Sequence, residues 1–491
     1  MCKGLGLLLF TGLLLGTSCP AEETCPLVEE STAKYVFLFI GDGMGSPQIH
    51  AAEAYLADKK QPDQLAGGIK AKLLSMDYFP VVGLSTTYAN DRFITDSAAA
   101  GTALACGMKT NVGVISMDPQ VSKPYKTLAE AAKEKGMKVG ILSSVSIDHA
   151  TPAVYYSHQP TRNNYREIAM ELANSDFDYF AGGGFKKDEG AGAIPAALAN
   201  GFKYVNDRAG LGGCVPGDRV IATTQTTDGS ALPYALDCLE GYYADNISLA
   251  EFTAKGIELL DNPDGFFMMV EGGKIDWACH ANDARAAIDD TLAFDQAVWE
   301  AIRFYMANPD DTLIVITGDH ECGGMTIGFA GTNYDTSFAD LARQRKSFIM
   351  FEVAYFKDYK AARGWSGVAD DIDQPLKDHI QYFFGLNWDD LTDYEKAQLE
   401  DAFDRSMAGA SIVSSQEDYE LYGGYEALTV TLTHLLNRKA GIGFTSYAHT
   451  GVPVPVYAMG FGEATFGGFY DNTDVARKIA KLMNVGIGDV N

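Results

Sequence analysis

The stretch FITDSAAAGTALACG, residues 93–107, places Ser97 directly after Asp96 and ahead of a run of very small residues. A serine hydroxyl is a weak nucleophile at neutral pH and needs a base or a cation to activate it. Asp96 would oppose the formation of an alkoxide because it is itself an anion. Ser97 is therefore either an ordinary helix N-cap or a nucleophile whose activator comes from elsewhere in the chain.

Three acidic side chains follow apolar segments that have the pattern of buried strands. The segments FLFIGDGMG, MMVEGGKID and IVITGDHE contain Asp42, Glu271 and Asp319. In open α/β sheets the binding crevice lies at the carboxyl ends of the strands, so we expect these carboxylates to meet at one sheet edge. Carboxylates that crowd together repel each other unless cations lie between them. The pattern therefore predicts a metal-binding edge.

Histidines with the spacing of metal ligands accompany these acids. Asp276 and His280 in EGGKIDWACHANDA are four residues apart and share one side of a helical turn. A carboxylate oxygen and an imidazole nitrogen that face one point suit zinc or a similar divalent ion. His320 follows Asp319 directly, and His449 lies in YAHTG before a late strand. Each histidine alone is more often a core or cap residue, but together they predict a cluster of metal sites.

A metal-binding sheet edge would supply the activator that Ser97 lacks. The stretch SAAAGTALACG should begin a helix at or near Ser97, whose N-terminal dipole favours negative charge. A divalent ion on the serine oxygen would lower the pKa of the hydroxyl and replace the missing base. The stretch SIDHATPAVYYSHQPTRNNY places His149 and Thr151 just after the apolar segment KVGILSS. Arg162 follows, and its planar fork matches two phosphate oxygens.

The chain resembles the alkaline phosphatases over about residues 30 to 460. The motifs GDGMG, TDSAAAGTA, HATP…TRNNY, EGGKIDWACH, GDHECGG and HTG occur in that family's order. The resemblance implies metal-dependent hydrolysis of phosphate monoesters through a phosphoserine on Ser97, with Arg162 binding the phosphate and inorganic phosphate released. Two cations about 4 Å apart can stabilise the attacking and leaving oxygens of an in-line displacement.

The resemblance also implies two Zn²⁺ and one Mg²⁺ per chain. The ligands it implies are Asp276, His280 and His449 for one zinc, Asp42, Asp319 and His320 for the second, which also holds Ser97, and Asp42, Thr151 and Glu271 for magnesium. His149 stands where some members have Asp near the magnesium, which leaves the identity of the third metal open. Trp277 stands where Lys or His often contacts the phosphate through water. Because indole carries no charge, we expect product phosphate to be held less tightly here.

Short apolar segments alternate with helical patterns along the chain and must position these residues. The expected strands are YVFLFI (35–40), KVGILSS (138–144), GFFMMV (265–270), TLIVIT (312–317) and VPVYAMG (454–460). Helical patterns precede the second strand (YKTLAEAAKEKG) and follow the third (DARAAIDDTLAFDQAVWEAIRFYMA). This alternation predicts an α/β fold, a three-layer α/β/α sandwich with a mostly parallel central sheet.

The alternation breaks between about 323 and 445, where aromatic and acidic segments take over. We therefore expect an insertion, 323–445, within an α/β domain that spans 30–491. Its aromatic stretches FIMFEVAYF and HIQYFFGLNW are expected to form a buried core rather than an interface.

The composition, with 47% hydrophobic and 21% charged residues, is that of a folded globular protein. A net charge of −27 argues against nucleic-acid binding and disfavours an anionic substrate unless bound metal ions supply a local positive site. Phosphorylated small molecules are the partners that the resemblance implies. Lys3 and the apolar LGLLLFTGLLLG predict a signal peptide over 1–18, and LGTSC resembles a lipoprotein cleavage site at Cys19.

We accordingly expect export to the periplasm or a lipid anchor at the cell envelope, with no transmembrane span. A homodimer is an expectation from the family alone. Export makes disulfides feasible, and Cys214 and Cys238, which flank a polar loop, are the best candidate pair. The other cysteines are expected to be buried thiols.

Two further functions stay open at this point. A phosphodiesterase of the same superfamily usually has a Thr nucleophile, and Arg162 favours the monoester because it would meet a phosphate with two charges. A non-catalytic metal- or phosphate-binding surface protein would be expected to lose some of the catalytic groups, which are all present here. A sulfatase is disfavoured because the C/S-x-P-x-R stretch is missing.

Overall fold

The computed structural model describes residues 32–58, 72–186, 192–225, 230–241, 243–364, 371–409 and 415–489. The expected signal peptide over 1–18 and the cleavage site at Cys19 lie outside these residues. Within the described ranges, no helix combines the length and the apolar character that a membrane-spanning segment requires.

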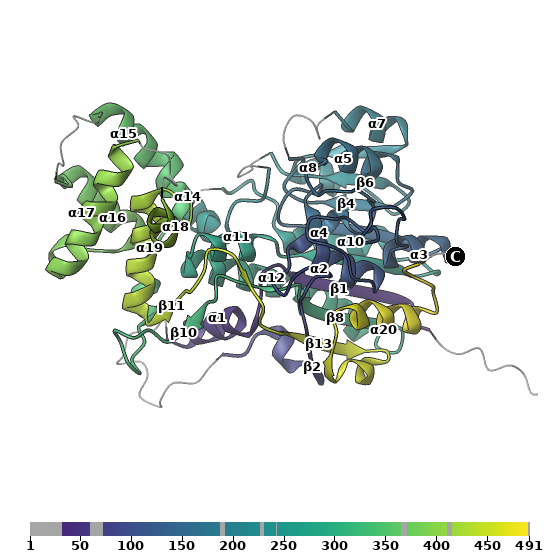
Figure 1. Cartoon of the computed structure of the whole chain (residues 1–491). Helices are drawn as coiled ribbons and strands as arrows, with labels where there is room; N and C mark the ends of the chain where they lie inside the picture. Colours follow the sequence, from purple (N-terminus) through teal and green to yellow (C-terminus); the bar gives the residue numbers. More distant parts are fainter. Residues whose placement is uncertain are drawn as a thin grey trace, which may run out of the picture. The chain divides into compact units, whose positions relative to one another are not determined.

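A ten-stranded sheet lies at the centre of the described structure (Figure 1). Its strand order is β14-β2-β13-β8-β1-β7-β3-β4-β6-β5. The strands are β1 Tyr35–Gly41, β2 Val81–Ser85, β3 Lys138–Ser143, β4 Tyr179–Ala181, β5 Phe202–Val205, β6 Arg219–Ala222, β7 Phe266–Glu271, β8 Thr312–Gly318, β13 Val454–Gly460 and β14 Gly468–Tyr470. Only β13 runs antiparallel to its neighbours β8 and β2 in this sheet. The five expected strands form, and the sheet is mostly parallel as predicted.

Side chains of the central strand β1 alternate between two hydrophobic cores, one on each face of the sheet. Phe37 and Phe39 belong to one core, and Val36, Leu38 and Ile40 belong to the other. Because successive side chains of a strand point to opposite faces, both faces must be covered by helices. The first core includes residues of α1 Ser46–Asp58, α10 Leu249–Leu260 and α12 Ala284–Ala307, and the second those of α2 Ser97–Cys106, α3 Leu128–Glu134, α5 Tyr165–Asn174 and α20 Thr473–Met483. The predicted three-layer sandwich is confirmed.

Short elements next to the sheet carry the candidate site and its surroundings. They are α4 Ala150–Ala153, α9 Ala235–Cys238, α11 Lys274–His280, β9 Glu321–Cys322 and β12 His449–Thr450, with α7 Ile194–Ala199 and α8 Arg208–Gly212 near the β5 edge. Strand β9 pairs antiparallel with β12, so two segments far apart in the sequence lie side by side.

Residues 338–440 form helices outside the sheet, drawn in green at the left of Figure 1. They are α13 Phe338–Leu341, α14 Phe348–Phe351, η4 Glu352–Phe356, α15 Lys357–Arg363, α16 Gln374–Phe384, α17 Asp393–Met407, α18 Gln416–Tyr422 and α19 Ala427–Ala440. Helix α19 contacts α13, α14, α16, α17 and α18. Phe351, Phe356 and Phe384 are fully buried, which confirms that the aromatic stretches form a core. The antiparallel pair β10 (Thr326–Ile327) and β11 (Ile442–Gly443) brings the two ends of this segment together.

The predicted disulfide between Cys214 and Cys238 is wrong, because both cysteines are free thiols. Each sulfur makes a local hydrogen bond instead: the Cys214 thiol donates to the Gly210 carbonyl at 3.4 Å, and Cys238 accepts from the Asn246 amide at 3.6 Å. Two cysteines at the ends of one loop need not have side chains oriented for a disulfide bond. The other three cysteines in the described residues are buried free thiols, as expected.

Candidate active site and metal centre

The carboxyl ends of β1, β7 and β8 meet at one edge of the sheet. The register places Ile40 of β1 beside Glu271 at the end of β7, while Asp42 and Asp319 follow the paired ends of β1 and β8. All three acidic side chains are buried. The carboxylates therefore meet where the strand pattern predicted.

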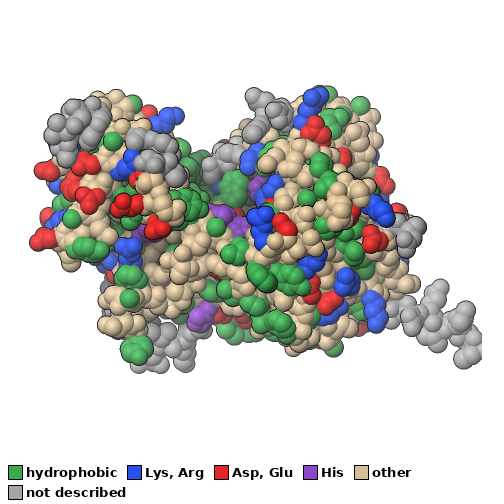
Figure 2. All heavy atoms as spheres, in the orientation of Figure 1, with side chains coloured by type: hydrophobic (Ala, Val, Ile, Leu, Met, Phe, Trp, Pro, Cys, Tyr) green, Lys and Arg blue, Asp and Glu red, His purple; other side chains and the backbone are tan. Residues whose placement is uncertain are grey.

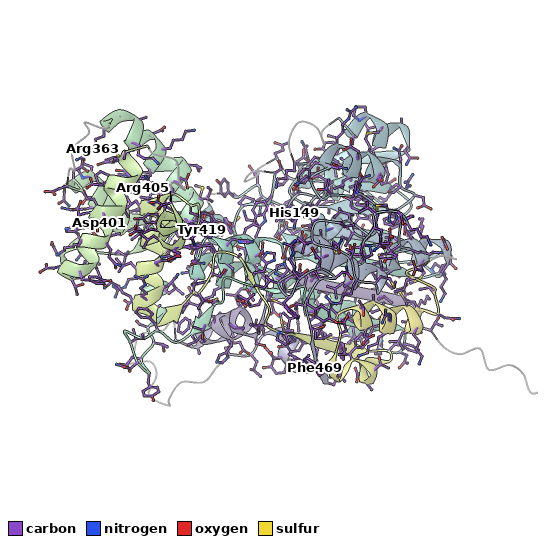
Figure 3. The ribbon with its side chains drawn as sticks, in the orientation of Figure 1. His149, Arg363, Asp401, Arg405, Tyr419 and Phe469 are labelled. Atoms are coloured by element: carbon purple, nitrogen blue, oxygen red, sulfur yellow. The ribbon has the colours of Figure 1, made fainter. Side chains whose placement is uncertain are left out.

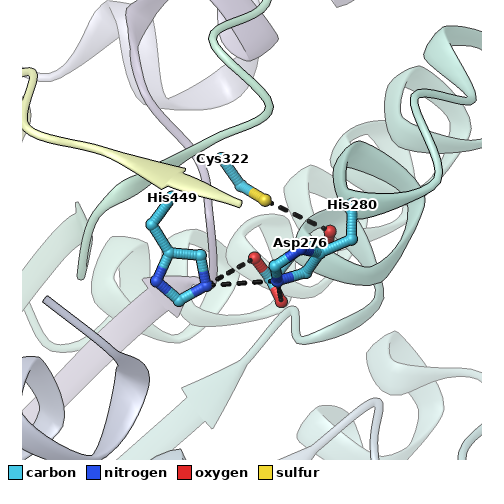
Figure 4. A group of neighbouring side chains, drawn as sticks. All are labelled: Asp276, His280, Cys322 and His449. Carbon is cyan, nitrogen blue, oxygen red and sulfur yellow. Dashed lines mark hydrogen bonds and ion pairs between the residues drawn. The ribbon is translucent and has the colours of Figure 1, made fainter. Parts of the chain in front are cut away.

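One group of side chains consists of Asp276 and His280 from α11 and His449 from β12, which face one another in Figure 4. Nε2 of His280 lies 3.2 Å from Nε2 of His449 and 3.3 Å from Oδ2 of Asp276. His449 Nε2 lies 3.5 Å from Asp276 Oδ1. Sγ of Cys322 is within 4.8 Å of these ligand atoms, although the thiol is directed at the Asp276 backbone carbonyl, 3.7 Å away. This spacing is suited to a single bound metal ion.

A second group consists of Asp42, Asp319 and His320, and Ser97 lies against it. Nε2 of His320 is 3.4 Å from Asp42 Oδ1, 3.2 Å from Asp319 Oδ2 and 3.4 Å from the Ser97 hydroxyl oxygen. Ser97 is buried and is the first residue of α2, as predicted, whereas the N-cap of that helix is Asp96. The alternative that Ser97 is the N-cap is therefore wrong.

A third group brings Asp42 and Glu271 together with His149, the residue that directly precedes α4. The Thr151 hydroxyl of α4 lies 3.5 Å from Asp42 Oδ2. Figure 2 shows histidine atoms in a hollow of the surface, and Figure 3, in the same orientation, labels His149 in that region. This group thus offers two carboxylates, a hydroxyl and an imidazole.

Several buried polar atoms of these groups have no hydrogen-bond partner within the described part of the chain. They are Oδ1 of Asp42, Oε1 of Glu271, Oδ1 of Asp276, Oδ2 of Asp319 and Nδ1 of both His149 and His320. Buried polar atoms are nearly always hydrogen-bonded in proteins, so these atoms mark places where another group binds. Buried oxygen and imidazole donors fit divalent metal ions.

Arg162 is linked to the serine through Asp96. Its Nη1 donates to Asp96 Oδ2 at 2.9 Å, and Asp96 also accepts from the backbone N–H groups of Ala99 and Gly113. Asp96 therefore caps α2 and orients Arg162, a role that the sequence did not reveal. Among the described residues Asp96 is the hydrogen-bond partner of this guanidinium, so other N–H donors remain for a ligand.

The family model for alkaline phosphatases matches residues 33–182 and 173–485. The chain belongs to the alkaline phosphatase family. It is 33% identical to alkaline phosphatase 3 of Bacillus subtilis over 474 residues, which cover 93% of this chain and 90% of that protein. Alkaline phosphatase 4 of the same species is 30% identical, with 97% of this chain and 95% of that protein covered.

Two solved structures support the same fold. The cold-active alkaline phosphatase of a psychrophilic Shewanella species superposes with a TM-score of 0.74 at 27% identity, covering 91% of this chain and 99% of that one. The Thermus thermophilus alkaline phosphatase gives a TM-score of 0.73 at 25% identity, with 93% and 92% covered. As a member of this family, the chain is an enzyme that hydrolyses phosphate monoesters in a metal-dependent reaction.

The electrostatics of this alkaline phosphatase favour cation binding at the sheet edge. Burial raises the pKa of Asp42 well above its usual value, and the neighbouring carboxylates, Asp319 foremost, raise it further. Burial also raises the pKa of Asp319 and of Glu271 to about 7. Burial lowers the pKa of His320 and His449 to about 4, so both imidazoles are neutral at pH 7 and keep a lone pair for a metal.

Glu321 is a residue that sequence reasoning missed. Its carboxylate accepts hydrogen bonds from Gln48 Nε2 at 2.8 Å and from the Thr450 hydroxyl. Glu321 follows His320 and Thr450 follows His449, so this carboxylate links the segments that carry two of the clustered histidines. The motif GDHE shows Glu321 directly after His320, but its partners Gln48 and Thr450 are distant in the sequence and could not be predicted from it.

Proposed function

We propose that Ser97 is the nucleophile of this alkaline phosphatase and is phosphorylated during turnover. The observation that carries this proposal is the position of its hydroxyl, 3.4 Å from His320 Nε2 at the edge of the Asp42, Asp319 and His320 group. Ser97 also lies in the first turn of α2, where the helix dipole favours an alkoxide and an incoming phosphate.

We also propose that the site holds two Zn²⁺ and one Mg²⁺. The proposed ligands are Asp276, His280 and His449 for one zinc, Asp42, Asp319, His320 and Ser97 for the second, and Asp42, Thr151 and Glu271, with His149 beside them, for magnesium. When bound, these ions would lower the pKa of the serine hydroxyl and of a water and would neutralise the phosphoryl oxygens. The unpartnered buried atoms of these residues support the assignment.

The remaining steps follow from the chain's own residues. Arg162, held by Asp96, binds two oxygens of the phosphate through its fork. The Ser97 oxygen attacks phosphorus, the bond to the leaving alkoxide breaks, and a phosphoserine forms. A water then attacks the phosphoserine, which restores the serine and releases inorganic phosphate. Because recognition ends at the phosphate, we propose broad specificity for phosphorylated small molecules.

The test compares initial rates on p-nitrophenyl phosphate and bis-p-nitrophenyl phosphate at mildly alkaline pH with zinc and magnesium present. A monoester rate far above the diester rate supports the proposal. A dominant diester rate would instead identify a phosphodiesterase with the same metal centre. If the metal-loaded protein hydrolyses neither compound, a phosphate- or metal-binding surface protein becomes the better account.

We further propose that the protein is exported, with a signal peptide over 1–18, to the periplasm or to a lipid anchor on Cys19. We propose that 323–445 is an insertion within the α/β domain 30–491, that the enzyme forms a homodimer, and that it does not bind nucleic acid. The net charge of −27 supports the absence of nucleic-acid binding, and the β10–β11 pair at the ends of the helical segment supports the insertion. Mass spectrometry of the mature N-terminus tests the signal peptide and the lipid anchor, and light scattering tests the homodimer.

A further inference from the structure

An anionic substrate needs positive charge at this site, because buried carboxylates surround the place where phosphate binds and the whole chain carries a net charge of −27. Arg162 supplies one cationic side chain. A second, Lys186, lies in the loop that follows β4 and is half-buried. Neither the motifs nor the family resemblance pointed to this residue.

The backbone of Lys186 is fixed to the segment that carries His149. The Lys186 N–H donates to both carboxylate oxygens of Asp148, at 2.9 and 3.1 Å, and Asp148 is fully buried. One residue earlier, the Ile147 N–H donates to the Gly184 carbonyl at 2.8 Å. The position of Lys186 is therefore set by the same loop that places His149 in the third ligand group.

The side chain of Lys186 extends toward aromatic residues of the site. Its Nζ lies 5.9 Å from the centre of the Trp277 ring and 5.1 Å from that of Tyr165. Trp277 in turn meets His149 edge-to-face, with 5.8 Å between the ring centres. Tyr165 lies three residues after Arg162. Within the described residues the Lys186 ammonium forms no salt bridge, and its side-chain contacts there are with the rings of Trp277 and Tyr165.

We propose that Lys186 is a second phosphate-binding cation of this enzyme, which contacts the phosphoryl oxygens, directly or through a water, from the side of His149 and Trp277. This inference rests on the proposed function of the same site. Arg162 binds two oxygens through its rigid fork, whereas the Lys186 ammonium offers a compact charge with several N–H donors. Lys186 thus supplies from the loop after β4 the charge that the indole of Trp277 cannot provide.

The test measures the inhibition constant for inorganic phosphate and the KM and kcat for p-nitrophenyl phosphate on the zinc- and magnesium-loaded enzyme. Lys186→Met keeps the length of the side chain without its charge, and Lys186→Arg keeps the charge. The matched control is Lys203→Ala on β5, whose ammonium pairs with Asp218 at the surface, 2.6 Å away, and which changes the net charge equally.

We expect Lys186→Met to raise the inhibition constant and KM by about tenfold, as for the loss of one charge-assisted contact. Lys186→Arg should restore most of the binding, and Lys203→Ala should match the wild type. An inhibition constant for Lys186→Met within about twofold of the control overturns the inference. If Lys186→Met does not fold, Lys186→Gln replaces it.

Failure of the proposed function gives a different result. In that case the wild-type enzyme, loaded with both metals, shows no monoester hydrolysis at all. Calorimetric titration of the same variants with inorganic phosphate then decides the role of Lys186 on its own. Weaker phosphate binding by Lys186→Met than by Lys203→Ala supports the inference, and equal binding overturns it.

Discussion

His280 Nδ1 lies 2.5 Å from the backbone carbonyl oxygen of Tyr447. An imidazole that donates Nδ1–H to a carbonyl presents the lone pair of Nε2 to a metal, and such contacts fix the orientation of metal-binding histidines. The Tyr447 hydroxyl in turn donates to the carbonyl of Leu421 in α18, at 2.5 Å. Its ring lies 6.4 Å from that of Tyr419, which is labelled in Figure 3. Tyr447 therefore connects the helical segment 338–440 to His280 of the candidate metal centre.

Gly423 tests this link. It ends α18 with φ +63°, and a Cβ added there would lie 2.1 Å from the Tyr447 ring. Gly423→Ala should displace Tyr447 and its carbonyl, so we expect zinc to be lost to a chelator about tenfold faster. Gly409→Ala is the control, because Gly409 has φ +59° and nothing within 4 Å of an added Cβ. Both variants carry a similar backbone cost of about 1 kcal/mol, so equal rates of zinc loss would contradict the link.

The carboxylate of Glu321 gives a second prediction. Glu321→Gln keeps the shape but turns one oxygen into an N–H donor, which cannot accept from both Gln48 and Thr450. We expect the free energy of unfolding to fall by about 1–3 kcal/mol, measured by chemical denaturation. The control is Glu258→Gln, at the exposed surface of α10. A loss no larger than that of the control would show that Glu321 does not link the histidine segments.

Trp277 gives a third prediction. Trp277→Lys adds a charge beside the site, and we expect the inhibition constant for inorganic phosphate to fall by about tenfold. Trp277→Phe keeps an uncharged ring near His149 and should leave that constant unchanged. An unchanged constant in Trp277→Lys would show that residue 277 does not face the phosphate.

Removal of the metals gives a fourth prediction. Without cations the buried carboxylates at the sheet edge repel one another, so chelation should lower the midpoint of thermal unfolding as well as abolish turnover. Addition of zinc and magnesium together should restore both. A midpoint that chelation does not change would mean that the clustered side chains hold no metal in the purified enzyme.

The sequence predicted the sheet and the clustered acidic side chains because both follow from local patterns. Asp42, Glu271 and Asp319 end apolar strands, and parallel strands bring their carboxyl ends to one edge. The contacts of Glu321 and Lys186 could not be predicted, because their partners are distant in the chain. Tyr447 contacts His280 through its backbone carbonyl, and every residue type has such a carbonyl, so the sequence could not predict this contact.

The disulfide prediction failed for a related reason. The spacing of Cys214 and Cys238 shows that a loop joins them but not how their side chains point. The Cys214 thiol hydrogen-bonds to Gly210 and the Cys238 sulfur to Asn246. The role of Asp96 in holding Arg162 was likewise hidden, since it depends on the folded positions of Arg162 and Gly113, which are distant from Asp96 in the sequence.

The central claim is that Ser97 carries the phosphoryl group during turnover. The most direct measurement is to mix the metal-loaded enzyme with a phosphate monoester, quench it rapidly in acid, and locate the phosphoryl group by peptide mass spectrometry. The account predicts phosphate on Ser97 in the wild type and none in Ser97→Ala, which should also lose most of its turnover. Phosphate on another residue, or wild-type turnover by Ser97→Ala, would contradict it.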